Sequence, residues 1–303
     1  SSPTALGRLH ALWTLQGRGA LDTSLLLQGL ASPQAELREN CLLLAESLLP
    51  GTPALQKKLL SMSLDQAPRV RWQAALTLGS LRHPEVNAAL LRILLRDHGF
   101  RWTRLAALSS LRFEADALFR SLLADPDFRS QVSESSIELT GELCGMIGAR
   151  MNLGETKLIV RLLASLIEFQ ARDEYRIATL DGLEAGLERS GAKLASDPST
   201  ASALDKMSQG ASPRLLAAAW RLTRRLGLPE TATQRKALAD AMTLAGGSAV
   251  PEPVRLESIR LLGLGQFDAM SYAAQPNPSQ VPSMALLAPT SWKAVTVGAD
   301  RSL

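Results

Sequence analysis

An arginine-led phrase recurs along the chain and constrains the fold more than any other feature. Its strongest copies begin at Arg8, Arg38, Arg71 and Arg101, separated by 30, 33 and 30 residues, and leucine-rich stretches follow them. Looser copies follow at Arg176, Arg214 and Arg255. A period of this length is typical of helical repeats that stack side by side, each covering the apolar face of its neighbour.

The composition favours helices over strands. Hydrophobic residues make up 46% of the 303-residue chain but aromatic residues only 4%, so leucine and alanine supply most of the apolar content. We therefore predict an all-α fold, a right-handed α-α superhelix of about seven helix pairs with an irregular C-terminal tail. The formal net charge of +4 is too small for the global basic field of a dedicated nucleic-acid-binding protein.

Apolar spacing, caps and helix breakers predict where the helices lie. The expected ranges are 4–16, 22–30, 33–48, 53–64, 68–81, 84–96, 100–111, 115–123, 132–147, 155–169, 174–189, 200–209, 213–226, 231–244 and 253–264. The short connectors between them predict antiparallel neighbours. We divide the chain into a solenoid at 4–265 and an irregular or disordered tail at 266–303.

Neither the cysteines nor the uncharged stretch near the end predicts a cross-link or a membrane anchor. Cys41 and Cys144 lie about three repeats apart, too far for a disulfide, and we expect buried free thiols. Residues 269–292 carry no formal charge but contain four prolines, which excludes a continuous membrane helix. The chain begins at Ser1 without an initiator Met, and we interpret it as part of a longer protein.

The recurring arginine has two interpretations. A guanidinium near the start of each second helix can bind acids or carbonyl groups of the next repeat, which predicts inter-repeat structural roles. The residues assigned to that role are Arg8, Arg38, Arg176, Arg214 and Arg255. The alternative is a ladder of guanidinium groups that faces an acidic ligand and grips carboxylate or phosphate with two hydrogen bonds each.

The stretch from Arg69 to Arg104 is the strongest candidate for a binding surface. It holds seven arginines against Glu85 and Asp97, and two tryptophans follow successive copies of the repeated arginine. Aromatic rings beside guanidinium groups can form a protein-binding hot spot or stack on nucleic-acid bases. The predicted partner-binding residues are Arg71, Trp72, Arg101, Trp102 and Arg104. The alternative is that the tryptophans pack between helices while the arginines stay solvated.

The sequence offers little for catalysis, so we expect no enzyme, no cofactor and no metal site. Its three histidines, His10, His83 and His98, have no cysteine or histidine partner at metal-ligand spacing. No glycine-rich phosphate loop, nucleophile elbow or haem-attachment sequence is present.

Phrases of the form Val-Arg-x-x-Ala-x-x-x-Leu, with helices opened by proline, resemble the HEAT repeats of the armadillo-like superfamily over about residues 4 to 265. Residues 7–15, followed by Gly17 and Ala20-Leu21-Asp22, are also similar to the start of the HEAT segment in large bacterial membrane-bound dehydrogenases. That family places a β-propeller before the repeats and a c-type cytochrome after them. The resemblance implies a periplasmic or extracellular location, and it carries no catalytic or haem-binding residue over to this chain.

These observations favour a non-catalytic scaffold whose partner is a protein, or other modules of the same redox protein. The alternative is a nucleic-acid-binding HEAT-like protein that uses the Arg69–Arg104 surface, as alkylpurine DNA glycosylases use a basic concave face. A third possibility, a pigment-handling protein like the phycobilisome lyases, has no supporting group of residues. The sequence does not identify the partner, the face that binds it or the oligomeric state.

Overall fold

The computed structural model describes residues 4–49, 51–112, 114–151, 156–191 and 197–264, and these residues form one all-α unit. Within them lie sixteen α-helices and two 3-10 turns, η1 (Glu46–Leu48) and η2 (Met62–Leu64). The helices are α1 (Ala5–Gly17), α2 (Thr23–Leu30), α3 (Ala35–Ala45), α4 (Pro53–Ser61), α5 (Pro68–Leu78), α6 (Val86–Asp97), α7 (Arg101–Ser110), α8 (Ala115–Ala124), α9 (Pro126–Ser130), α10 (Glu134–Arg150), α11 (Thr156–Glu168), α12 (Asp173–Ser190), α13 (Pro198–Ser208), α14 (Pro213–Arg225), α15 (Ala232–Gly246) and α16 (Glu252–Leu262).

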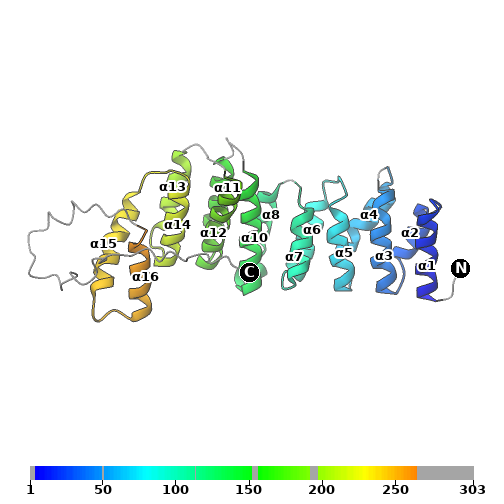
Figure 1. Cartoon of the computed structure of the whole chain (residues 1–303), viewed down its shortest axis with the longest axis horizontal. Helices are drawn as coiled ribbons and strands as arrows, with labels where there is room; N and C mark the ends of the chain where they lie inside the picture. The colour runs from blue at the N-terminus through cyan, green and yellow to red at the C-terminus, as the bar shows by residue number, and fades with distance from the viewer. Residues whose placement is uncertain (1–3, 50, 113, 152–155, 192–196, 265–303) are drawn as a thin grey trace, which may run out of the picture. The chain divides into compact units, whose positions relative to one another are not determined.

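The helices form two rows, and each helix packs on the next member of its own row (Figure 1). One row runs through α1, α3, α5, α7, α10, α12, α14 and α16, and the other through α2, α4, α6, α8, α11, α13 and α15. The described part of the chain is therefore α1 followed by seven helix pairs, with the short α9 inserted between α8 and α10. This arrangement confirms the predicted all-α solenoid.

Local sequence signals fix the helix starts. The Asp22 carboxylate accepts a hydrogen bond from the Leu25 backbone N–H at 2.8 Å, and Ser133 and Thr231 begin capping boxes with Ser136 and Gln234. Proline occupies the first turn of α4, α5, α9, α13, α14 and α16, where its missing N–H leaves no helical hydrogen bond unmade. These signals let short connectors turn the chain back on itself between the rows.

Leucine fills most of the space between the rows, as the composition predicts. Leu26, Leu42, Leu55 and Leu90 are fully buried and belong to one continuous core. Both cysteines are buried free thiols, and burial raises the pKa of Cys41 to about 11 and that of Cys144 to about 12. The thiols therefore stay protonated at neutral pH and serve as small apolar side chains in the core.

Two local expectations were wrong. Residues 124–131 lie between two of the expected helices, 115–123 and 132–147, yet Asp125 caps the short helix α9 within them by accepting a hydrogen bond from the Phe128 N–H at 2.9 Å. The third helix was expected to begin at residue 33, but α3 begins at Ala35 with Gln34 as its N-cap, and Ser32 binds Gln34 in the preceding turn.

No helix in the described ranges is long and apolar enough to cross a membrane. The uncharged stretch 269–292 and the tail assigned to 266–303 lie outside the described residues. The division into a solenoid and a tail therefore stays a prediction.

Candidate partner-binding edge

Seven arginines, most of them from the repeated phrase, share one structural position, the fourth residue of a helix. The arginines in this position are Arg8, Arg38, Arg71, Arg104, Arg129, Arg176 and Arg255. Arg104, rather than Arg101, is thus the structural equivalent of Arg38 and Arg71, and the interval between these three residues is 33 residues in both steps. Arg101 and Arg71 are flanked by similar residues, but aligning the two on that basis is wrong by three residues.

Arg38 joins the layer of α3 to the connection before α5. Its Nε and Nη2 donate to the two carboxylate oxygens of Asp65 at 2.8 Å each, and its Nη1 donates to the Ser32 and Pro33 carbonyl oxygens at 2.9 and 3.0 Å. Burial alone would raise the pKa of Asp65. Hydrogen bonds from Arg38 and the Ala67 N–H, with the charges of Arg38 and Arg71, outweigh burial and hold that pKa below its usual value.

Arg71 repeats this arrangement one layer further along, in a more buried setting. Its Nε and Nη2 donate to the Asp97 carboxylate at 2.5 and 2.6 Å, and its Nη1 donates to the carbonyl oxygens of Asp65 and Gln66 at 2.6 and 2.9 Å. Arg71 is only 2% exposed. Its guanidinium is therefore enclosed by the protein and has no donor face open to solvent.

Arg104 is also 2% exposed and bridges to α10. It donates to the Glu138 and Glu142 carboxylates at 2.5 and 3.1 Å and to the His98 carbonyl oxygen at 2.8 Å. Arg71 and Arg104, both predicted to bind a partner, thus hold neighbouring layers together. Arg38 makes the same kind of contacts. We propose that Arg38, Arg71 and Arg104 all hold neighbouring layers together.

The other arginines expected to link repeats differ from one another. Arg8 and Arg176 are half-buried, and the Nε of each has no hydrogen-bond partner among the described residues. Arg176 lies 3.6 Å from Asp173 of its own helix. Arg214 is exposed, and neither it nor Arg255 forms an ion pair with a described carboxylate. An inter-repeat role for these four residues stays a prediction.

Arg221, which the sequence did not single out, joins α14 to α12. It donates to Asp181 at 2.5 Å and to Glu184 at 3.0 Å. The two acids one turn apart were the available signal, but the sequence does not show which arginine faces them.

The N-terminal end of α7 exposes two large aromatic residues. Phe100 is 61% exposed and Trp102 is 70% exposed, and the Arg101 guanidinium lies 5.6 Å from the centre of the Trp102 ring. Trp72, by contrast, is half-buried and packs against the core. In the structural register Trp102 is the counterpart of Arg69, since both are the second residue of their helix, so the two tryptophans do not occupy equivalent positions.

Leu64 is a further exposed apolar residue, in a connection that Arg71 links to the end of α6. Arg71 binds the Asp65 and Gln66 carbonyl groups together with the Asp97 carboxylate, so the segments before α5 and before α7 meet at one guanidinium. Leu64, 63% exposed, adjoins the first segment, and Phe100 ends the second. We call Leu64, Phe100, Arg101 and Trp102 the aromatic edge.

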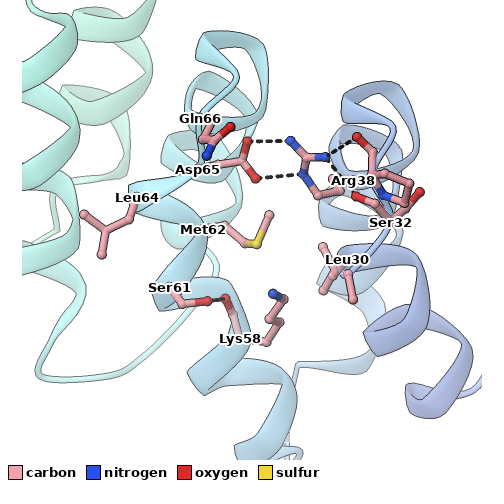
Figure 2. A pocket seen from close by; sticks show the side chains of 11 residues that line it. Leu30, Ser32, Arg38, Lys58, Ser61, Met62, Leu64, Asp65 and Gln66 are labelled. Carbon is pink, nitrogen blue, oxygen red and sulfur yellow. Dashed lines mark hydrogen bonds and ion pairs between the residues drawn. The ribbon is translucent and has the colours of Figure 1, made fainter.

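A polar cavity of about 440 Å³ lies next to the aromatic edge, between the connection after α2 and the connection before α5. Figure 2 shows the Arg38–Asp65 ion pair at one end of this cavity and Lys58 at the other, with Leu64 directed away from the cavity. A second cavity of about 600 Å³, lined by Leu216, Ala237, Leu261 and neighbours, lies between the α13–α14 and α15–α16 pairs.

Metal-ligand geometry is absent from the described ranges: they hold no group of three or more His, Cys, Asp or Glu residues able to bind an ion. His98 Nδ1 lies 3.1 Å from the Leu94 carbonyl oxygen, and the imidazole meets the Phe128 ring edge-on. His83 accepts a hydrogen bond from the Glu85 N–H at 3.2 Å. Both histidines have local structural partners.

Comparison with known families gives one match. Residues 23–112 match the family model for HEAT repeats. The matched stretch runs from the start of α2 to just beyond α7, so it covers three helix pairs and includes the whole aromatic edge. The match supports a HEAT-repeat protein. Neither the curated proteins nor the solved structures give a match to the chain.

Proposed function

We propose that this chain is a non-catalytic HEAT-repeat scaffold that binds another protein on the aromatic edge. HEAT repeats suggest a scaffold or protein-interaction role. The observation that carries the proposal is the exposure of Phe100 and Trp102 within the matched repeats. An exposed cluster of large apolar side chains beside an arginine is typical of protein-binding hot spots, in which tryptophan and arginine are enriched.

Site-specific photo-cross-linking in the cells that naturally make the protein tests this proposal. A photoreactive phenylalanine analogue at position 102 should give one defined cross-linked protein, or a defined site within a longer version of this chain. The same analogue at Ser80, an exposed residue outside the aromatic edge, is the control. Equal cross-linking patterns at positions 102 and 80 would show that the aromatic edge has no specific partner.

We further propose that the scaffold spaces modules of a larger redox protein, on the strength of the resemblance of residues 7–22 to the HEAT segment of membrane-bound dehydrogenases. The gene of the parent protein tests this directly. It should encode a β-propeller upstream and a Cys-x-x-Cys-His sequence downstream. A parent gene that encodes neither would refute this part of the proposal and leave the scaffold role intact.

The geometry gives nucleic-acid binding less support. Two of the arginines assigned to that alternative, Arg71 and Arg104, are enclosed in ion pairs and present no guanidinium face to a phosphate. Exposed Arg69, Arg96 and Arg101 remain beside Trp102, and they serve a protein hot spot equally well. We therefore treat nucleic-acid binding as an outcome to be tested below.

A further inference from the structure

We infer that the partner of the aromatic edge docks through an acidic segment that carries apolar side chains. This inference rests on the proposed function and names the chemistry of the partner. Three observations support it: arginines pair with the mostly buried Asp65, Asp97 and Glu39, the side chains of Arg69, Arg96 and Arg101 are exposed, and the Arg101 guanidinium lies beside the exposed Trp102 ring.

The acids of this region are held by arginines. Asp65 binds Arg38, Asp97 binds Arg71, and their side chains are only 8% and 3% exposed. Glu39 pairs with Arg69 at 3.0 Å in an asymmetric way, because the Glu39 side chain is mostly buried whereas the Arg69 side chain is largely exposed. These three carboxylates therefore contribute little negative charge to the surface, whereas Glu138 is half-exposed and has the buried Arg104 as its counterion.

The cations that remain outside are positioned around the aromatic edge. Arg69, Arg96 and Arg101 are exposed. Lys58 lines the neighbouring polar cavity and forms no ion pair with a described carboxylate. A segment that binds the aromatic edge therefore meets exposed guanidinium groups, which favours carboxylates in that segment and speeds encounter.

Apolar contacts would supply the rest of the affinity. The side chains of Leu64, Phe100 and Trp102 are exposed to solvent. Burying their apolar surface against a partner favours binding through the hydrophobic effect. The Arg101 guanidinium already lies over the Trp102 ring, so the aromatic group and the cation are preorganised as one unit. Arginine also grips a carboxylate through two parallel hydrogen bonds, which fixes the position of an acidic residue next to an apolar one.

A peptide selection tests this chemistry and does not require that the partner be identified first. The full chain is immobilised and screened against a displayed library of random 12-residue peptides, with counter-selection on a Trp102→Ser variant. Because Trp102 is exposed, the variant should keep the circular dichroism spectrum and melting curve of the wild type. Trp13→Ser is the matched control, since Trp13 is a second partly exposed tryptophan outside the aromatic edge.

We expect the peptides that depend on Trp102 to be net acidic, to contain Leu, Phe or Trp, and to bind at least tenfold more weakly to Trp102→Ser and to Arg101→Glu. They should bind Trp13→Ser and Arg214→Glu, which changes an exposed arginine on α14, like the wild type. Selection of basic or uncharged peptides, or of none that depends on Trp102, would overturn the inference. Tighter binding of a 20-nucleotide single-stranded DNA, lost in Trp102→Ser, would overturn it in favour of nucleic acid.

The two proposals fail in distinguishable ways. A specific cross-link at position 102 to a segment without acidic residues would refute the acidic partner and leave the scaffold role standing. Loss of any specific cross-link at position 102 would refute the partner-binding role itself.

Discussion

Neighbouring layers are joined by different chemistry in two regions of the solenoid. From α3 to α7, arginines at the fourth helix position bind a carboxylate of the next layer and backbone carbonyl groups of the turn before their own helix. Between α10 and α12 the joint consists of glycines, which bring two backbones into direct contact. Side chains at the helix ends link the layers of the first region, whereas in the second region the helix backbones themselves are in contact.

The glycine joint leaves no room for a side chain. A Cβ on Gly182 would lie 2.5 Å from the Gly141 carbonyl oxygen, and one on Gly186 would clash with the Gly145 carbonyl oxygen and the Ala149 backbone nitrogen. Glycine costs helix stability at each of these sites, yet close backbone packing gains dispersion and weak Cα–H···O contacts. Neighbouring layers are thus joined by ion pairs in one region and by direct backbone contact at glycines in the other.

Arg71→Met should give the largest effect, because it leaves the Asp97 carboxylate buried without its partner. Breaking a buried ion pair in this way costs about 3–5 kcal/mol. Urea denaturation of the full described array should show this loss as a lower midpoint. Arg96→Met, at an exposed arginine on the following helix α6, is the control and should change the midpoint little. Equal effects of the two variants would show that the Arg71 bridge does not hold the layers.

Gly186→Ala tests the glycine joint and should be the next largest effect. The methyl group forces α10 and α12 apart, and overpacking of this kind costs about 1–3 kcal/mol. Gly17→Ala is the matched control, since no neighbouring atom lies within 4 Å of the added Cβ, and helix propensity alone should make it neutral or slightly stabilising. A stabilised Gly186→Ala protein in thermal denaturation would argue against backbone contact between these helices.

The double variant Arg71→Met/Asp97→Leu distinguishes a charge requirement from a shape requirement. Removing both charges abolishes the unpaired carboxylate, so the double variant should be more stable than Arg71→Met by about 0.5–3 kcal/mol, the range of coupling between residues in contact. It should not reach wild-type stability, because the Asp65 and Gln66 carbonyl groups lose their donor. Additive losses in a double-mutant cycle would contradict direct coupling between the two side chains.

Acid should weaken the arginine joints before the glycine joint. The pKa of Asp65 is held below its usual value of about 4, so the stabilisation from Asp65 is present above that pH and is lost as the pH falls through the lowered pKa. The stability difference between wild type and Asp65→Asn should therefore shrink between pH 6 and pH 2 in melting experiments. A constant difference over that range would mean that Asp65 does not titrate with folding.

Much of the fold follows from sequence, because the repeat period and the caps are local signals. The leucine stripes, the prolines at helix starts and the glycines after helices place fifteen of the sixteen described helices. Helix α9 was missed for two reasons. An Asp-Pro pair is typical of turns but also of helix starts, where Asp is the N-cap and Pro the first helical residue, and a helix of five residues is too short to show an apolar stripe.

The candidate site was less predictable, because side-chain burial depends on register. The sequences around Arg71 and Arg101 are similar, Val-Arg-Trp and Phe-Arg-Trp. Arg101 nevertheless lies three residues earlier in its helix than Arg71 does, because α7 begins at Arg101 whereas α5 begins at Pro68. That shift buries Arg104 and exposes Trp102, which sequence similarity alone pairs with the half-buried Trp72. The role of the glycines in α10 and α12, close backbone contact, likewise becomes apparent only when the two helices are packed against each other.

The shared carbonyl groups at Arg71 have a consequence for how the array opens. One guanidinium is bonded to the turn that precedes its own helix and to an acid 26 residues further along. If Asp97 moves away, the buried guanidinium loses its counterion, and if the turn opens, it loses two hydrogen-bond acceptors, so the opening of one repeat penalises its neighbour. Amide hydrogen exchange in α5 and α7 should accordingly rise and fall together, as a single cooperative unit.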